Sequence, residues 1–279
     1  MALAFIDVTA PVSANHPMPN LRTPFANYSY AMRVYYDDSW GVPSANGRPL
    51  LFHFHGSGAA GPLTGVLLDR LIAKGWNVIS CQGFGVGLSS ESPFRYGYGN
   101  VSAPHFLALF IKLAWWVYTC VGRGIALYPG RNITLLGHSM GASACMAYNA
   151  NYHCQGLHAM RGMVINAATV AGLGTGTWND IWRNIATMIP IFNLASIRTI
   201  ASYADDDLYA PPDYSRRIQL GLPTNSPVYM VSPGVGGHGW MSASVANADL
   251  AANWCEQIMT GAVIRDRFNQ IAIPGPVAY

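Results

Sequence analysis

Charged residues are scarce in this sequence, and they form no basic block. Asp, Glu, Lys and Arg make up 10% of the 279 residues, against about a quarter in an average soluble domain. The formal net charge is only +3, and the longest acidic run is the three aspartates at 205–207. Nucleic-acid binding needs basic residues clustered on one face, so this composition argues against a nucleic-acid partner.

Cysteine is sparse too, and no apolar run is long enough to cross a membrane. The cysteines lack metal-ligand spacing, so we expect buried thiols and no metal site; they are Cys81, Cys120, Cys145, Cys154 and Cys255. The N-terminal residues lack the basic region of a signal peptide. The most apolar segment, 106–122, is interrupted by Lys112 and is shorter than the roughly 20 residues of a membrane span. We therefore expect no stable membrane insertion and a cytoplasmic location, with export by another route left open.

The chain alternates between short apolar runs and segments with helical spacing, which predicts an α/β fold. The predicted strands are 28–36, 49–55, 76–81, 132–137, 162–167, 197–204 and 227–232. The predicted helices are 61–75, 106–122, a small-residue helix at 140–151, and 242–259. Strands joined through helices pair in parallel and are covered on both faces, so residues 28–279 are expected to form one doubly wound, mostly parallel domain. Residues 1–27 are rich in Pro and Asn and are predicted to be an irregular arm.

Residues 172–194 form an insertion between two late strands. Trp178, Ile181 and Trp182 begin an apolar stripe at helical spacing that runs on to Ile189. Such a stripe is typical of a helix that faces the core. A small helical cap over a pocket is the alternative interpretation, and both stay open here.

The stretch LLGHSMGAS at 135–143 contains a G-x-S-x-G pattern, formed by Gly137, Ser139 and Gly141. It follows an apolar strand-like run and leads into small helix-forming residues, which is the context of a nucleophile elbow. Glycines two positions before and after the serine leave room where the strand and the helix come close. A plain strand-to-helix turn is the alternative, but this context favours Ser139 as a nucleophile.

A serine hydroxyl needs a base to remove its proton, and the base needs a group that fixes its tautomer. His153 and His158 follow Ser139 too closely to lie on the loop of a later strand. His238 follows the last predicted strand and has glycines on both sides, which leave room for approach to the serine. We therefore favour His238 as the base; the alternative is a loop histidine that packs on Trp240.

Three aspartates compete for the role of the acid, because 205–207 follows directly after a predicted strand. The D-x-x-x-P spacing with Pro211 favours Asp207. Asp206 and Asp205 stay as alternatives, since either could cap the turn through local hydrogen bonds. The chain order of serine, aspartate and histidine is the one expected for this type of elbow.

An oxyanion formed at the attacked carbonyl needs preorganised N–H donors. The glycine-rich turn HFHGSGAAGP follows the strand 49–55 and could supply one of them. We predict that the backbone N–H groups of Ser57 and Met140 form the oxyanion hole, with Gly58 as the alternative to Ser57. A phosphate-binding loop is excluded, because the turn lacks a G-K-[ST] ending.

From about residue 28 to its end, the chain resembles the α/β-hydrolase family. The resemblance is carried by HGSG at 55–58, GHSMG at 137–141, DLYAP at 207–211 and GHG at 237–239. The loop GFGVGLSSES at 83–92 is also similar to the loop after the third core strand of the family. The resemblance implies a serine hydrolase that acts through an acyl-enzyme intermediate without a cofactor, most often an esterase or lipase.

Hydrolysis of a carboxylic ester is the function that this resemblance favours. The expected substrate is a small ester with an apolar acyl or aryl group. The residues predicted to bind it are Gly56, Gly58, Phe84, Trp178, Trp182 and Trp240. An amide, thioester or polyester hydrolase is the alternative among enzymes, because the triad does not specify the leaving group. A non-catalytic binding protein on the same fold is the alternative from another class.

Overall fold

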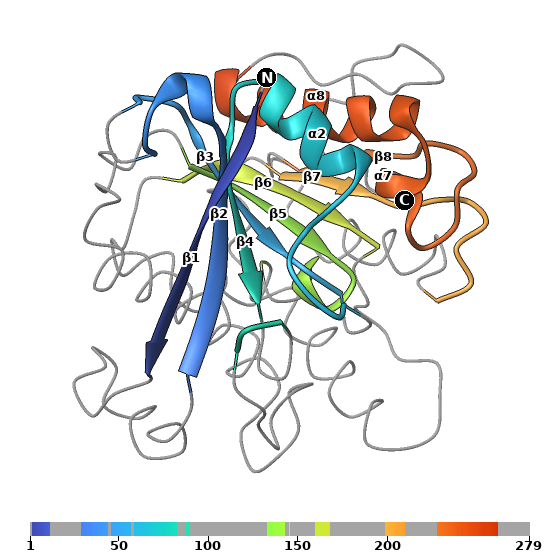
Figure 1. Cartoon of the computed structure of the whole chain (residues 1–279). Coiled ribbons are helices and arrows are strands. Elements are labelled where there is room, and N and C mark those ends of the chain that lie inside the picture. The colour runs from blue at the N-terminus through green and yellow to red at the C-terminus, as the bar shows by residue number, and fades with distance from the viewer. Residues whose placement is uncertain are drawn as a thin grey trace.

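The computed structural model of the chain describes ten parts of the sequence. They are residues 2–11, 29–43, 46–56, 59–82, 87–89, 133–142, 145, 160–167, 199–209 and 228–261. The strands in these parts form one eight-stranded sheet in the order β1-β2-β4-β3-β5-β6-β7-β8 (Figure 1). Their bounds are Leu3–Pro11 (β1), Ser29–Asp37 (β2), Leu50–Phe54 (β3), Asn77–Gln82 (β4), Ile133–His138 (β5), Met160–Asn166 (β6), Thr199–Ser202 (β7) and Val228–Val231 (β8).

The sheet is mostly parallel, as the sequence predicts. The six strands from β4 to β8 in the sheet order run parallel to one another, whereas β2 is antiparallel to both β1 and β4. Strand β3 lies between β4 and β5, so the chain first builds outward on one side of β3 and then returns to the other. In a parallel sheet, such a reversal opens a crevice at the carboxyl ends of the two strands involved. The residues that follow β3 and β5 are therefore placed to form a site.

The prediction of an irregular arm at 1–27 is wrong for its first part. Strand β1 pairs with β2 along its whole length, from Leu3 opposite Asp37 to Pro11 opposite Ser29. Its side chains alternate in burial: Val8 is buried, while Phe5 is 52% exposed. This period of two is the signature of a strand with one covered face. The Pro and Asn residues that follow β1 led the sequence analysis to assign the whole segment 1–27 to an irregular arm.

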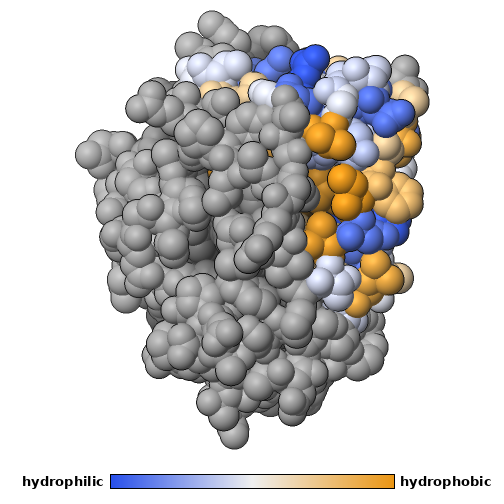
Figure 2. Space-filling view, turned by 60° about the vertical axis from the view of Figure 1, so that its left-hand side comes forward, coloured by the Kyte–Doolittle hydropathy of each residue, from blue (hydrophilic) through white to orange (hydrophobic). Residues whose placement is uncertain are grey.

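The exposed face of β1 is tied to β2 by a charged side chain. Arg33 donates two hydrogen bonds of 2.7 Å to the carboxylate of Asp7, and its guanidinium lies 4.0 Å from the centre of the Phe5 ring. Apolar and hydrophilic side chains lie side by side over the described surface that Figure 2 shows. The pairing and the ring contact together shield part of an edge strand that would otherwise expose its apolar side chains.

Helices α2 (Val66–Ala73) and α8 (Val245–Thr260) lie together on one side of the sheet (Figure 1). Four residues of α2 are buried at helical spacing, and α8 buries a stripe that includes Trp254 and Cys255. The Ser244 side chain caps the N-terminus of α8, and Gly261 ends it in a left-handed conformation, an arrangement typical of helix ends. Both predicted helices are thus confirmed, with ends within a few residues of those expected.

The described residues include three of the five cysteines but neither the predicted helix 106–122 nor the insertion 172–194. Cys81, Cys145 and Cys255 are buried free thiols, and burial raises the pKa of each of them. The predicted helix 106–122 and the insertion 172–194 lie outside the described residues. Within the described parts, no helix is long and apolar enough to cross a membrane.

Candidate active site

Ser139 lies on the sharp turn between β5 and the helical segment that begins at Met140. Its φ of 53° is in the left-handed region, and among the described residues only Ala167 shares this feature without being glycine. The N–H of Ser139 donates a hydrogen bond of 2.9 Å to the carbonyl oxygen of Asn166, which holds the turn against β6. A strained backbone of this kind is kept only where its surroundings over-determine it, and such residues cluster at functional sites.

The two glycines of the motif are needed because the backbone is crowded around the turn. A Cβ atom on Gly137 would lie 2.6 Å from the carbonyl oxygen of Gly141. A Cβ atom on Gly141 would overlap the carbonyl oxygen of Phe54 in β3. The helix therefore starts in direct contact with the ends of β3 and β5, which is the close approach that the sequence analysis expected.

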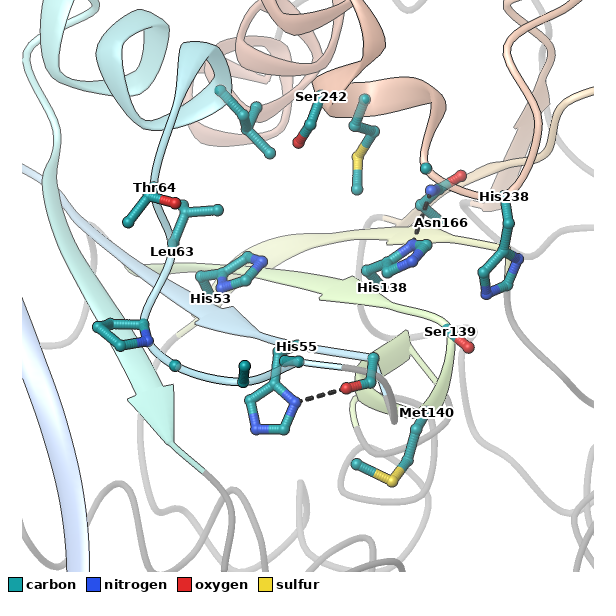
Figure 3. A pocket seen from close by; sticks show the side chains of 18 of the residues that line it. His53, His55, Leu63, Thr64, His138, Ser139, Met140, Asn166, His238 and Ser242 are labelled. Atoms are coloured by element: carbon teal, nitrogen blue, oxygen red, sulfur yellow. Dashed lines mark hydrogen bonds between the residues drawn. The ribbon is translucent and has the colours of Figure 1, made fainter. Parts of the chain in front are cut away.

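His238 and Asp207 are paired on the loops that follow β8 and β7. The Nδ1 atom of His238 lies 2.9 Å and 3.1 Å from the two carboxylate oxygens of Asp207. The Asp207 side chain is fully buried, whereas that of His238 is 23% exposed. Because a carboxylate only accepts, Nδ1 carries the proton, which leaves Nε2 of a neutral ring as an acceptor. The two side chains of Ser139 and His238 lie close together in Figure 3.

The other two aspartates of the run have different partners. Asp206 accepts hydrogen bonds from the N–H groups of Gly236 and Gly237, at 2.9 Å and 2.8 Å. Asp205 accepts a longer bond of 3.3 Å from the Ser232 hydroxyl. Of the three carboxylates, it is that of Asp207 that contacts His238, while Asp206 fastens the loop that carries His238.

The glycines before His238 serve this loop in a way that sequence reasoning missed. Gly236 has a φ of 141° and Gly237 a φ of 62°, which side chains of other residues seldom tolerate. A Cβ atom on Gly236 would also lie 2.7 Å from Cβ of Trp240. The glycines thus present two adjacent N–H groups to Asp206, rather than only leaving space beside the histidine.

A hydrogen-bond network behind the serine fixes the tautomer of His138. The Oδ1 atom of Asn166 accepts from Nε1 of Trp240 at 2.5 Å and from the Ser202 hydroxyl at 3.0 Å. The amide nitrogen of Asn166 therefore donates to Nδ1 of His138, 3.0 Å away. Nδ1 is then an acceptor, so the proton of His138 resides on Nε2. Burial, reinforced by the nearby His238, lowers the pKa of His138 to about 3.

These residues line one cavity of about 810 Å³ at the carboxyl ends of β3 and β5 (Figure 3). Ser139, Met140 and His238 form one part of its wall, and Gly56 lies beside them. Another part belongs to the segment before α2, to α2 itself and to the short helix α7 (Trp240–Ala243); its members are Leu63, Thr64, Leu67, Met241 and Ser242. Histidines from β3 and β5 form the floor, namely His53, His55 and His138. The size is in the range of small-molecule sites.

Five of the residues predicted for the oxyanion hole or for substrate binding lie outside the described residues. They are Ser57, Gly58, Phe84, Trp178 and Trp182. Gly56 and Met140 line the cavity. Trp240 is fully buried and packs on Trp254 with ring centres 5.3 Å apart, so the structure places it in the core and not at the cavity wall. The indole N–H of Trp240 donates a hydrogen bond to Oδ1 of Asn166, so Trp240 supports the site without lining the cavity.

The sequence analysis did not single out His53, His55 or Asn166. His53 lies within the apolar run of β3, and His55 follows directly after β3 ends at Phe54. Asn166 is a polar residue at the carboxyl end of a buried parallel strand. Polar side chains at such positions are the signal that could have identified all three. Among the described residues, no group of three or more His, Cys, Asp or Glu side chains is arranged to hold a metal ion.

No protein-family model matches this sequence, and no curated protein is significantly similar to it. Solved structures do match the fold. The alpha/beta hydrolase GrgF from Penicillium sp. sh18 aligns with a TM-score of 0.59 at 11% identity, covering 92% of this chain and 98% of that one. The thioesterase domain from the curacin biosynthetic pathway aligns with a TM-score of 0.51 at 16% identity, covering 84% and 95%. A meta-cleavage product hydrolase from Pseudomonas fluorescens IP01 aligns with a TM-score of 0.51 at 12% identity, covering 77% and 91%.

Proposed function

We propose that this chain, whose fold is that of the α/β hydrolases, is a serine hydrolase that cleaves carboxylic esters through an acyl-enzyme intermediate. One observation carries the proposal. Ser139 stands on a strained turn at the wall of the same cavity into which His238 projects, and His238 is held by the buried carboxylate of Asp207. A nucleophile, a base and a group that orients the base are the three parts that such catalysis requires.

In the proposed mechanism, Nε2 of His238 takes the proton of the Ser139 hydroxyl as its oxygen attacks the ester carbonyl. The new bond to Ser139 forms a tetrahedral intermediate, and the proton passes from His238 to the leaving alcohol as the ester bond breaks. Water, activated by the same histidine, then releases the acid from the serine. Asp207 keeps the His238 proton on Nδ1 throughout and stabilises the imidazolium that forms.

The oxyanion needs N–H donors directed at the cavity. The N–H of Ser139 is already bound to Asn166, so the donor from the elbow is the next one, that of Met140 at the N-terminus of the helix. The helix dipole favours negative charge at that position. The predicted second donor is Ser57 or Gly58, next to Gly56 at the cavity wall.

An apolar acyl or aryl group fits the remaining wall. Leu63, Leu67 and Met241 line the same cavity as Ser139, and burial of apolar surface against them would contribute to binding. Neither the triad nor this wall specifies the leaving group, so esters, thioesters and amides with the same acyl group belong in one test.

The test is reaction with p-nitrophenyl esters from acetate to long acyl chains, beside thioesters and anilides with the same acyl groups. We expect ester hydrolysis that Ser139→Ala lowers by about 10⁶-fold, since loss of the nucleophile removes the covalent route. A fluorophosphonate should label the wild-type protein at Ser139 and leave the variant unlabelled. A folded protein that neither hydrolyses these substrates nor reacts with the fluorophosphonate would refute the proposal and favour a binding protein.

A further inference from the structure

His53 is a buried histidine of the cavity wall that has no polar partner among the described residues. The residue is 6% exposed and lines the cavity. Its Nδ1 atom takes part in no hydrogen bond within the described parts of the chain. Figure 3 shows its ring on the floor of the cavity, between the segment that carries Thr64 and the ring of His138. The other two histidines of the floor differ, because Nδ1 of His55 is bonded to the carbonyl of Gly56 and Nδ1 of His138 to Asn166.

A buried polar group without hydrogen bonds lowers stability. The neighbours of His53 in β3, Phe52 and Phe54, are apolar and fully buried, and an apolar side chain at position 53 would avoid the penalty. Burial, together with His55 and His138, lowers the pKa of His53 to about 3, so its ring is neutral near pH 7. A neutral imidazole presents one donor and one acceptor. The unmet hydrogen bond at Nδ1 of His53 is therefore that of an uncharged ring.

We infer that His53 is a specificity-determining residue that binds a hydroxyl group of the substrate, at the part of the cavity away from Ser139. This inference rests on the proposed function and adds the substrate class. A hydroxyl can either donate to or accept from a ring nitrogen of a neutral imidazole, whichever the tautomer requires. No Lys or Arg is among the described residues that line the cavity, so a carboxylate or phosphate would be buried there without a counter-charge, at a high cost.

The register of the sheet places the hydroxyl far from the bond that breaks. His53 is paired with Leu136, which lies three residues before Ser139. At about 3.3 Å per residue, His53 is set back by about 10 Å along the strands. The cavity wall also includes the buried apolar side chains of Leu67 and Met241. The substrate should therefore carry an apolar chain with the ester at one end and a hydroxyl well along it.

The experiment compares pairs of substrates that differ only in this hydroxyl. In the first arm, p-nitrophenyl ω-hydroxyalkanoates are measured against alkanoates of equal chain length; in the second arm, ω-hydroxyalkyl acetates are measured against alkyl acetates. In one arm, at one chain length, we expect the wild-type kcat/KM to favour the hydroxylated substrate by about two- to ten-fold, as a single matched hydrogen bond can provide. The arm that shows the preference tells whether the acyl or the alcohol part occupies the floor of the cavity.

Three variants separate recognition from structure. His53→Phe should abolish the preference and raise the melting temperature, because it removes the unpaired polar group. His53→Gln keeps one donor and one acceptor and should retain part of the preference. Thr134→Val is the matched control, since the Thr134 hydroxyl is also buried without a partner among the described residues but does not line the cavity. It should raise the melting temperature and leave the preference unchanged.

Binding without turnover separates failure of this inference from failure of the proposed function. We expect 1,8-octanediol to raise the melting temperature of the wild-type protein more than 1-octanol does, and His53→Phe to remove the difference. If no ester is cleaved but the diol is still preferred through His53, the inference stands and the proposed function falls. If esters are cleaved with equal kcat/KM whether or not they carry the hydroxyl, or if His53→Phe keeps the preference, the inference is overturned.

Discussion

Asp205, Asp206 and Asp207 are chemically identical neighbours, and only their surroundings in the fold separate them. Asp207 is fully buried against His238 and also accepts a hydrogen bond of 2.8 Å from the N–H of Tyr209. Asp206 binds two backbone N–H groups of the loop that carries His238. The D-x-x-x-P spacing favoured Asp207 but could not exclude the others, because a spacing says nothing about which side chain turns inward.

A series of Asp→Asn variants at these three positions tests the assignment. Asp207→Asn should lower kcat for ester hydrolysis by about 10⁴-fold, because an amide can impose the wrong tautomer on the histidine. Asp206→Asn should lower it by only about ten-fold, because the amide oxygen still accepts from Gly236 and Gly237 but without the strength that charge adds. Asp205→Asn serves as the control and should leave kcat near the wild-type value.

Steady-state kinetics on one p-nitrophenyl ester would rank the three variants. The assignment of Asp207 would be refuted if Asp205→Asn or Asp206→Asn were the most impaired while Asp207→Asn kept most of its activity. Circular dichroism spectra like that of the wild-type protein are needed for each variant, since Asp207 is buried and its replacement could disturb the loop.

At the same scale, the residues that sequence reasoning found are those with a local signature. Ser139 stands between two glycines, and His238 follows two. Asn166 and His53 have no such signature, since each lies inside an apolar run where a single polar residue attracts little notice. The role of Asn166 depends on neighbours from other strands, such as Ser202 in β7 and His138 in β5, and only the register of the sheet brings these neighbours together.

At the scale of elements, the turn after β5 is built by contact with β3. Gly141 approaches Phe54 so closely that a Cβ atom would overlap its carbonyl oxygen, and the carbonyl oxygen of His55 would lie only 2.8 Å away. These are backbone atoms of a central strand, so they cannot move aside as a flexible side chain would. The helix start can relieve the overlap only by shifting away from β3.

We therefore expect Gly141→Ala to lower the free energy of unfolding by about 3 kcal/mol, which is a large value for one added methyl group. The matched control is Gly61→Ala, because a Cβ atom on Gly61 would meet no atom within 4 Å; its free energy of unfolding should stay within about 0.5 kcal/mol of wild type. Urea unfolding followed by tryptophan fluorescence measures both. Equal stability of the two variants would mean that the turn does not pack against β3 as described.

The order of strands and helices could be predicted because each described element has its own hydrophobic period. The strands β2 to β8 and the helices α2 and α8 all overlap with predicted segments, with ends shifted by a few residues. Strand β1 was missed although Ala4, Ile6 and Val8 alternate with more exposed side chains. A strand at the edge of a sheet buries only one face and lacks the continuous apolar run of a central strand, so a short alternation beside prolines is easily assigned to a loop.

At the scale of the whole molecule, the site exists because the sheet reverses its order at β3. The nucleophile follows β5, the histidine floor follows β3 and β5, and the acid and the base follow β7 and β8. The ends of four strands thus meet at one edge of the sheet, although they are separated along the sequence. Chain order and motif type predict that they converge, but not which side chains line the cavity, because this depends on the direction in which each residue of a strand points.

The buried histidines should also set how the stability of the whole molecule depends on pH. His53 and His138 each have a pKa near 3 in the folded protein, compared with about 6.5 in an unfolded chain. Between these values the unfolded state binds more protons than the folded state, so the free energy of unfolding falls as the pH drops from 6.5 towards 3. Each histidine can contribute a slope of up to about 1.4 kcal/mol per pH unit over this range.

Urea unfolding of wild-type and His53→Phe protein at pH 7, 6, 5 and 4 would measure this contribution. The variant should lose stability less steeply below pH 6.5, by up to about 1.4 kcal/mol per pH unit. Carboxylates also titrate in this range, but they are common to both proteins and cancel in the difference. Thr134→Val, which removes a buried hydroxyl and no titratable group, should keep the wild-type slope. If His53→Phe and wild type lost stability in parallel down to pH 4, His53 would not be buried as a neutral ring, and its place in the floor of the cavity would have to be revised.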